Sequence, residues 1–192
     1  GGGKSSISAY VTNKDVFKKS YGTLGGSLLH STTYNSLAEE CATVIETTKL
    51  INDNKIIKNL SKLDKLMKSK LDNLKLKYPN IISEIRGSGC HYGIIFKKKF
   101  NFLKKIIKYI PIKFIQDPLF LDKIVVTSIM EEYFSQKKVI TAFSSNIDVI
   151  LLISPPINSS EKIINQKIDE LELIIKNGVE KLVLKFIKKN LI

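Results

Sequence analysis

The segment from His30 to Ser36 carries the side chains best suited to bind an anion. It reads His-Ser-Thr-Thr-Tyr-Asn-Ser and places several hydroxyl groups just before an expected helix. The first N–H groups of a helix lack acceptors within the helix, and the positive end of the helix dipole lies there. A helix start can therefore bind phosphate without a formally charged side chain. A Ser- and Thr-rich helix cap without a ligand has the same pattern, so this segment alone leaves both interpretations open.

Other residues of a reactive type lack the partners that chemistry would require. Gly1-Gly2-Gly3 allows a close approach of backbone to a ligand, but glycine runs are also common in turns. Lys4 stands among small polar residues that would not lower its pKa, which indicates a surface lysine rather than a nucleophile. Arg86-Gly87-Ser88-Gly89 could hold an anion in its turn, and a tight hairpin explains it equally well. His30 and His91 have no partner at metal-ligand spacing.

The elements that would position these residues follow from the hydrophobic pattern. Residues 7–12 alternate between apolar and polar, which predicts a short strand, and residues 16–19 form a short capped segment. A helix is expected from Ser36 to Ile51, because Ser36-Leu37-Ala38-Glu39 fits a capping box. The remaining expected elements are helices over 56–74, 127–138 and 160–186, the last with a bend at Gly178, and strands over 82–86, 92–96, 141–143 and 148–154.

A lysine-rich stretch interrupts this order. Residues 100–115 place apolar side chains on one side and lysines on the other. Such a stripe either faces a core or lies on an anionic membrane surface. The whole order indicates an α/β or α+β chain with two parts, residues 1–54 and residues 55–192.

Composition limits the class of partner. The 192 residues are 43% hydrophobic and carry a net charge of +13, which would usually suggest nucleic acid. Arg86 is the single arginine among 31 basic residues, whereas proteins that read nucleic acid rely on arginine for bidentate contacts. We therefore expect no nucleic-acid partner and attribute the charge to lysine-rich compositional drift, with a real anionic partner as the alternative.

Cysteine content and hydropathy bear on where the protein resides. Cys41 and Cys90 are too few and too far apart for a disulfide framework or a metal site. The longest purely apolar run is Val149–Ile153, far shorter than the roughly 18 residues that span a bilayer. These features predict a protein of the reducing cytoplasm with no membrane partner.

Taken in order, these segments resemble the class III aminotransferases, which are pyridoxal-phosphate enzymes of fold type I. The family shows a glycine run after a lysine, then a His-x-x-Thr-aromatic segment that opens a helix, and Gly1–Gly3 and His30–Tyr34 match these. An Arg-Gly-x-Gly segment and a strand that runs into Pro-Pro follow, matched by Arg86–Gly89 and Val149–Pro156. No single motif is specific, but four in this order and spacing are.

The resemblance implies a cofactor, a site and an assembly. Residues 1–54 would be the C-terminal piece of the large cofactor-binding domain, and residues 55–192 the α+β small domain with its linking helix, strands and long final helix. Thr33, and with it Thr32, would bind the phosphate of pyridoxal 5'-phosphate in the neighbouring subunit. The substrates would be an amine or amino acid and a 2-oxo acid. The partner would be a second copy in a homodimer or a complementing N-terminal fragment.

Two departures from the family affect function. The lysine that forms the Schiff base with the cofactor precedes the glycine run, so it is expected upstream of Gly1, and this chain supplies no catalytic residue. Many members carry an arginine three residues before Pro-Pro that grips a substrate carboxylate, and Leu152 stands there. Either the substrate is held differently or the site has decayed.

We therefore expect an incomplete enzyme that is inactive alone. A non-catalytic remnant or partner-binding module of a split or decayed gene is the alternative, and a basic surface-binding protein is a third possibility.

Overall fold

The structure is a computed structural model, which describes residues 4–29, 32, 33, 35, 37–53, 56–97 and 117–190. The chain forms two compact units, one ending at Ile57 and one beginning at Lys58. We call them the N-terminal unit and the C-terminal unit. The sequence placed the boundary after residue 54, and the assignment of the two parts to a large and a small domain remains a prediction.

The N-terminal unit contains helices α1 (Lys14–Tyr21) and α2 (Ala38–Asp53) and the short helix η1 (Gly26–Leu28). Asn13 caps α1, because its side chain accepts a hydrogen bond from the N–H of Val16 at 2.9 Å. The expected helix ending at Ile51 is confirmed as α2, which ends two residues later. Its expected capping residue, Ser36, lies outside the described residues.

The strand expected over residues 7–12 is wrong, because these residues form no regular element. A strand is stable only when its backbone groups pair with another strand. No described residue of the N-terminal unit is in a strand, so the alternating pattern had nothing to pair with.

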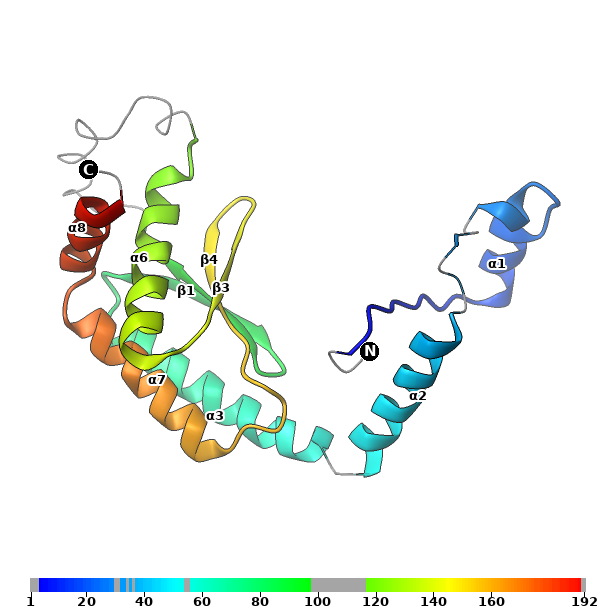
Figure 1. Cartoon of the computed structure of the whole chain (residues 1–192), viewed down its shortest axis with the longest axis horizontal. Helices are drawn as coiled ribbons and strands as arrows, with labels where there is room; N and C mark the ends of the chain where they lie inside the picture. The colour runs from blue at the N-terminus through cyan, green and yellow to red at the C-terminus, as the bar shows by residue number, and fades with distance from the viewer. Residues whose placement is uncertain are drawn as a thin grey trace. The chain divides into compact units, whose positions relative to one another are not determined.

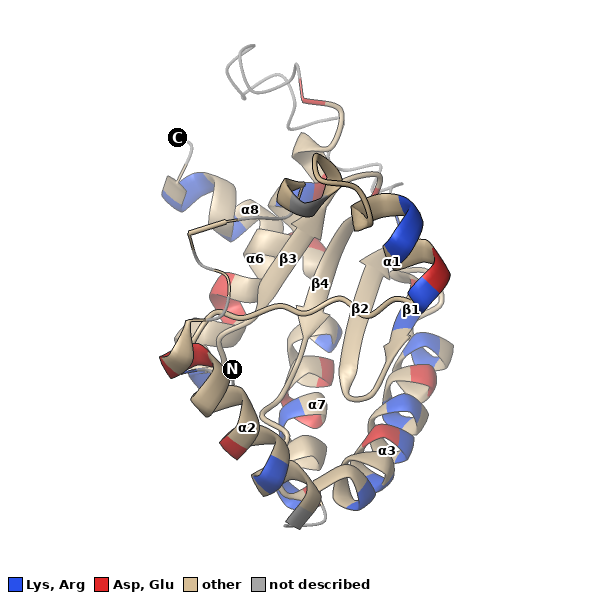
Figure 2. Cartoon of the chain, turned by 90° about the vertical axis from the view of Figure 1, so that its right-hand side faces the viewer, with Lys and Arg blue, Asp and Glu red and all other residues tan. Residues whose placement is uncertain are grey.

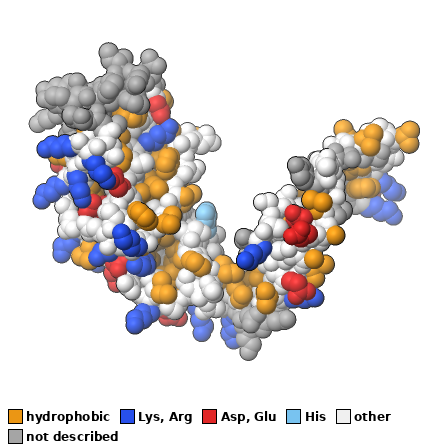
Figure 3. Space-filling model, viewed as in Figure 1, with side chains coloured by type: hydrophobic (Ala, Val, Ile, Leu, Met, Phe, Trp, Pro, Cys, Tyr) orange, Lys and Arg blue, Asp and Glu red, His pale blue; other side chains and the backbone are white. Residues whose placement is uncertain are grey.

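The N-terminal unit buries almost none of its apolar side chains. Gly26 is the one buried residue among its described positions. Large apolar side chains lie at the surface along the whole unit, as the hydrophobic colouring of α1 and α2 in Figure 3 shows. They are Ile7, Tyr10, Val11, Val16, Phe17, Leu24, Leu28, Leu29, Leu37, Ile45, Leu50 and Ile57. The described part of this unit therefore has no hydrophobic core of its own.

The C-terminal unit is built on a four-stranded antiparallel sheet with the order β1-β2-β4-β3. The strands are β1 (Ile82–Ser88), β2 (His91–Phe96), β3 (Ala142–Ser145) and β4 (Val149–Ile153). All four strand predictions are confirmed to within two residues at each end. Figures 1 and 2 show the helices of this unit on one side of the sheet.

The helices of this unit are α3 (Ile56–Lys77), α6 (Phe120–Lys137), α7 (Glu161–Lys176) and α8 (Val179–Asn190). Each turns an apolar stripe toward the sheet, as Leu63, Met67, Leu71 and Leu74 do on α3. The sheet contributes the alternate side chains Ile94, Phe96, Val149 and Leu151 to the same core. This single core holds the sheet and the four helices together.

Two expected helices differ from the structure. The helix expected to begin at Thr127 begins at Phe120, because Asp117 accepts a hydrogen bond from the N–H of Leu119 at 2.8 Å and orders the turn before it. The single last helix is two helices, because Gly178 has a φ of +102° that no helix accommodates. The basic stretch over residues 100–115 lies outside the described residues.

The β1–β2 hairpin is joined to α3 by one carboxylate. Gly89 and Cys90 both have positive φ, as the central residues of a type I′ turn require. Asp64 on α3 accepts hydrogen bonds from the N–H of Cys90 at 3.1 Å and from the hydroxyl of Tyr92 at 2.6 Å. The Tyr92 and Cys90 hydrogen bonds lower the pKa of Asp64, and burial raises the pKa of Tyr92. Asp64 thus holds Cys90 in a conformation that a non-glycine residue rarely adopts.

We expect Asp64→Ala to lower the free energy of unfolding by about 1–3 kcal/mol at neutral pH, because it leaves the Cys90 N–H and the Tyr92 hydroxyl without their acceptor. The folded-state pKa of Asp64 is lowered, so its contribution is present above the unfolded pKa and is lost as pH falls through the folded value. Urea unfolding at a series of pH values would measure this. The difference in stability between wild type and Asp64→Ala should shrink as pH falls through the lowered folded-state pKa of Asp64. Asp72→Ala, which removes only an exposed pair with Lys68, is the control, and an equal loss in both variants would contradict the role of Asp64.

We expect Gly178→Ala to lower the free energy of unfolding by about 1–2 kcal/mol, because a side chain at positive φ strains the backbone. Asn177→Ala is the matched control, since Asn177 has ordinary helical angles with a φ of −66°. Thermal unfolding of the three proteins would compare them. A Gly178→Ala chain as stable as the wild type would show that α7 and α8 can form one continuous helix.

Candidate functional site

Thr32 and Thr33 lie just before α2, where the sequence placed the phosphate ligands. The Thr32 hydroxyl donates to Oδ1 of Asn35 at 3.0 Å, and the N–H of Asn35 donates to the carbonyl oxygen of Thr32 at 3.1 Å. These two bonds close a tight turn. Thr33 is exposed, and its hydroxyl has no hydrogen-bond partner among the described residues. Of the two hydroxyl groups, that of Thr33 is free to donate to a ligand.

The first turn of α2 is not itself a strong anion site. Glu39 and Glu40 occupy this turn, and their carboxylates already interact favourably with the positive end of the helix dipole. A phosphate placed here would meet two negative charges. The Thr33 hydroxyl can therefore contribute one hydrogen bond, whereas charge neutralisation must come from groups outside the described part of this unit.

The remaining residues of the two N-terminal motifs are not all described. His30, Ser31, Tyr34 and Ser36 lie outside the described residues, as do Gly1–Gly3. Lys4 is described and is exposed in a turn, as expected for a surface lysine. His91 is exposed at the start of β2.

Arg86 is occupied by carboxylates of its own sheet. Its Nε and Nη2 atoms donate to the two carboxylate oxygens of Glu84, each at 2.7 Å, and Nη1 lies 3.6 Å from Asp148. The Glu84 pair raises the pKa of Arg86, and the same pair lowers the pKa of Glu84. Gly87 at φ +139° and Gly89 at +61° form the hairpin. Of the two sequence interpretations of Arg86–Gly89, the structure favours the hairpin over an anion site.

Leu152 lies on the sheet face opposite the core. Its neighbours across the strands are Gly93 on β2 and Ala142 on β3, and Arg86 pairs with Gly93 on the far side. The adjacent side chain Ile150 fills the space over Gly93, where an added Cβ would lie 2.4 Å from its Cγ2 atom. Leu152 therefore stands in an apolar row, and the one cation of that row, Arg86, is bound to Glu84.

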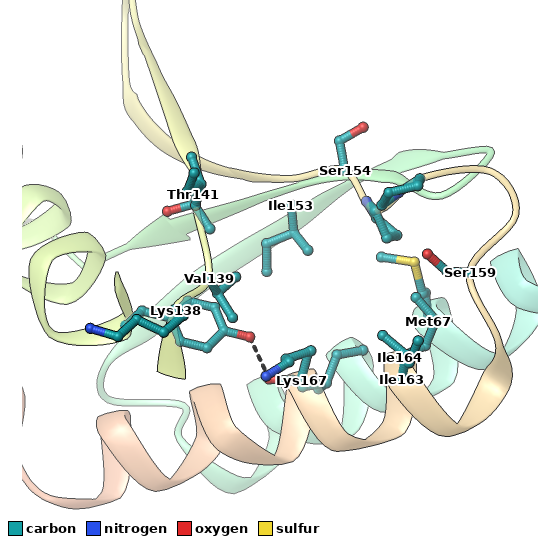
Figure 4. Close-up of a pocket in the computed structure, with 15 residues that line it drawn as sticks. Met67, Lys138, Val139, Thr141, Ile153, Ser154, Ser159, Ile163, Ile164 and Lys167 are labelled. Carbon is teal, nitrogen blue, oxygen red and sulfur yellow. Dashed lines mark hydrogen bonds between the residues drawn. The ribbon is translucent and has the colours of Figure 1, made fainter. Parts of the chain in front are cut away.

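A cavity of about 280 Å³ lies in the C-terminal unit and was not anticipated from the sequence. In Figure 4, Val139 and Ile153 face Met67 and Ile164 across it. The lining comes from α3, α6, the residues that follow α6, the end of β4, the segment that joins β4 to α7, and α7 itself. No local motif links residues so far apart in the chain, so only the fold reveals this site.

Two further features are absent from the part of the chain that the structure describes. It contains no group of His, Cys, Asp or Glu side chains that could hold a metal ion. None of its helices is both long and apolar enough to cross a membrane. Cys41 and Cys90 are both free thiols, the first exposed and the second buried.

Comparison with known proteins places these features in a family. The family model of class-III aminotransferases matches residues 1–148. An uncharacterized aminotransferase of Schizosaccharomyces pombe is 27% identical over 95 residues, which cover 50% of this chain and 20% of the relative. The match to the family model includes the glycine run, the Thr32–Thr33 segment and the β1–β2 hairpin.

Solved structures show the same fold. A transaminase from the marine bacterium Virgibacillus is similar with a TM-score of 0.61 at 16% identity, covering 88% of this chain and 34% of that one. A Bacillus anthracis aminotransferase gives 0.59 at 19% identity, with 85% and 34% covered. Acetylornithine aminotransferase from Elizabethkingia anophelis gives 0.55 at 17%, with 77% and 31% covered. The chain thus spans about a third of the length of these structures, and a fifth of the curated relative.

Proposed function

Because the chain belongs to the class-III aminotransferase family, we propose that it is the C-terminal part of a pyridoxal-phosphate-dependent aminotransferase. The complete enzyme would transfer an amino group from an amine or amino acid to a 2-oxo acid. The observation that carries the proposal is the family match over residues 1–148, joined to a fold shared with about a third of several aminotransferase structures. The cofactor, the substrates and the assembly are part of the proposal.

In this account the two units belong to different domains. Residues 1–54 are the end of the large cofactor-binding domain, and residues 55–192 are the small domain. The contrast in burial supports this division. The C-terminal unit has its own core, whereas the described residues of the N-terminal unit leave their apolar side chains exposed. A segment cut from the interior of a larger domain would have this property, because the surfaces that cover it belong to the rest of that domain.

Thr33 is the residue of this chain that we assign to the cofactor phosphate, with Thr32 beside it. The chemistry fits, because the Thr33 hydroxyl is exposed and has no partner among the described residues. The Thr32 hydroxyl is already bound to Asn35, so its contribution is to fix the turn that presents Thr33. The acids Glu39 and Glu40 mean that cations of the complete site must balance the phosphate charge.

Pyridoxal phosphate supplies the aldehyde that accepts and releases the amino group and the ring that withdraws electrons. Its lysine anchor is proposed to precede Gly1, and Lys4 does not replace it. This chain would then bind phosphate and provide the wall of the small domain, and it would not catalyse transfer by itself. The apolar row around Leu152 offers no free cation to a substrate carboxylate there, which favours an amine without that group or a carboxylate held elsewhere.

Assembly completes the site in this proposal. The partner is either a second copy in a homodimer, with each Thr33 serving its neighbour, or a chain that supplies the N-terminal part. The reducing cytoplasm is the proposed location, in keeping with two free cysteines.

We expect the 192-residue chain with pyridoxal phosphate, an amine donor and a 2-oxo acid to show no turnover, because the cofactor lysine is absent. Co-expression with the protein segment encoded directly upstream of residue 1 should restore a tight complex, visible cofactor absorbance and transamination. Chromatography and absorbance spectroscopy would follow both. Turnover by the chain alone would refute the assigned role of the upstream lysine.

Failure of the co-expressed complex to bind the cofactor would favour a different function. The chain would then be a non-catalytic remnant or a partner-binding module. A pull-down that recovers the upstream segment without cofactor binding would identify such a module.

We expect Thr33→Val in the co-expressed complex to weaken pyridoxal phosphate binding by about 10- to 100-fold, the effect of one hydrogen bond to a charged group. Pyridoxal without phosphate should bind the variant and the wild type equally. Thr48→Val, an exposed change on α2, is the control. Equal loss of affinity for both forms of the cofactor would show that Thr33 acts through folding rather than through the phosphate.

A further inference from the structure

The cavity of the C-terminal unit has a wall of closely packed apolar side chains. Met67, Ile164 and Ile168 line it and also belong to the core, with exposed fractions of 0%, 3% and 5%. Core packing at this density holds side chains in fixed rotamers, so this wall is in place before any ligand binds. All the lining residues belong to one unit, so the shape of the cavity does not depend on how the two units are arranged.

The charged side chains of the lining are engaged elsewhere. Lys167 and Lys138 are the two lysines of the lining, and no aspartate or glutamate lines it. The Lys167 ammonium lies 2.8 Å from a carboxylate oxygen of Glu170. The Lys138 ammonium lies 5.6 Å from the centre of the Phe134 ring and points away from the cavity in Figure 4. The cavity therefore receives no charged group from its own lining.

The hydroxyl groups of the lining add little polarity to the cavity. The Tyr133 hydroxyl donates to the carbonyl oxygen of Lys167 at 2.5 Å. The Thr141 oxygen is buried, and in Figure 4 it points away from the cavity, as does that of Ser154. Ser159 contributes one further hydroxyl, which is uncharged. An ion moved into these surroundings would lose its hydration without gaining a partner of opposite charge, so the lining favours a neutral ligand.

From these features we propose that the cavity binds a small, neutral, apolar molecule of the class of a benzene ring with a short alkyl chain. An apolar cavity of roughly 150 Å³ holds benzene, and this cavity measures about 280 Å³. The ligand lies between Val139 and Ile153 on one side and Met67 and Ile164 on the other (Figure 4). Removal of apolar surface from water drives the binding. This site uses none of the residues assigned to the cofactor, so it stands independently of the proposed aminotransferase activity.

The two methionines of the chain provide a local test of this site. Met67 lines the cavity, whereas Met130 on α6 does not. The 192-residue chain, labelled with [methyl-13C]methionine, would be titrated with toluene and followed by NMR, and the Met130→Leu variant would identify the two signals. We expect a saturable shift of the Met67 methyl signal and an unchanged Met130 signal. An unchanged Met67 signal, or an equal and non-saturable shift of both signals, would overturn the proposal.

Charged analogues of the same size test the preference for a neutral ligand. Benzoate and benzylammonium keep the ring of toluene and carry charges of opposite sign. We expect each ion to bind at least about 10-fold more weakly than toluene in the Met67 titration, because neither charge finds a partner in the lining. Binding of either ion as tightly as toluene would contradict the proposal.

A variant with a filled cavity locates the binding. Val139→Phe places a ring in the space that Val139 faces in Figure 4 and should abolish the saturable shift of the Met67 signal. Ile147→Phe, at a position outside the lining whose exposed fraction is 79%, should leave that shift unchanged. Unchanged toluene affinity in a folded Val139→Phe chain would place the binding elsewhere and refute the assignment. The comparison of Met67 with Met130 in the wild-type chain decides the proposal if Val139→Phe fails to fold.

Discussion

The structure depends on where apolar side chains can be buried. In the C-terminal unit one face of a four-stranded sheet is covered by α3, α6, α7 and α8, and the residues between them are nearly inaccessible to water. At roughly 25 cal/mol per Å² of apolar surface, this burial is the dominant favourable term for that unit. The described residues of the N-terminal unit have no comparable core. Their helices must obtain tertiary support from a surface that this unit does not supply.

This difference in burial between the two units bears on the proposed function. The family match begins in the N-terminal unit and continues into the C-terminal unit, and the chain spans about a third of the aminotransferase structures with the same fold. In the proposed assignment, residues 1–54 belong to the large domain and residues 55–192 to the small domain. Thr33, the residue proposed to bind the cofactor phosphate, is exposed in the N-terminal unit. In the proposed enzyme both the missing core and the missing cofactor lysine come from the same upstream part.

The lysines of the C-terminal unit can be considered in the same way, as residues that serve either the fold or the function. On the face that Figure 3 shows, lysines lie over several helices of the C-terminal unit. Several of them pair with carboxylates of a neighbouring helix, as Lys70 does with Asp169 and Lys185 with Glu132. Exposed pairs contribute little individually. They indicate that part of the lysine content serves the surface of the fold.

Sequence reasoning succeeded where periodicity has a direct physical cause. The apolar stripe of α3 and the two hairpin strands β1 and β2 follow from burial of one face, and both were predicted. It failed for residues 7–12, because an alternating pattern does not supply a pairing strand, and at Gly178, where a single positive φ divides a helix. The assignment of Thr32 and Thr33 to the cofactor phosphate stays a prediction, which rests on their place before a helix and on the family motif. The cavity beside Met67 was not predicted, since its walls come from residues scattered between 67 and 168.

Hydrogen exchange of the isolated 192-residue chain, followed by mass spectrometry, tests the central claim most directly. The account predicts strong protection in α3, the sheet, α6 and α7, and rapid exchange in α1 and α2, because among the described residues the core lies in the C-terminal unit. Protection of α1 and α2 equal to that of α3, in the monomeric chain, would contradict it. Such a result would mean that the N-terminal unit is stable without the rest of an aminotransferase.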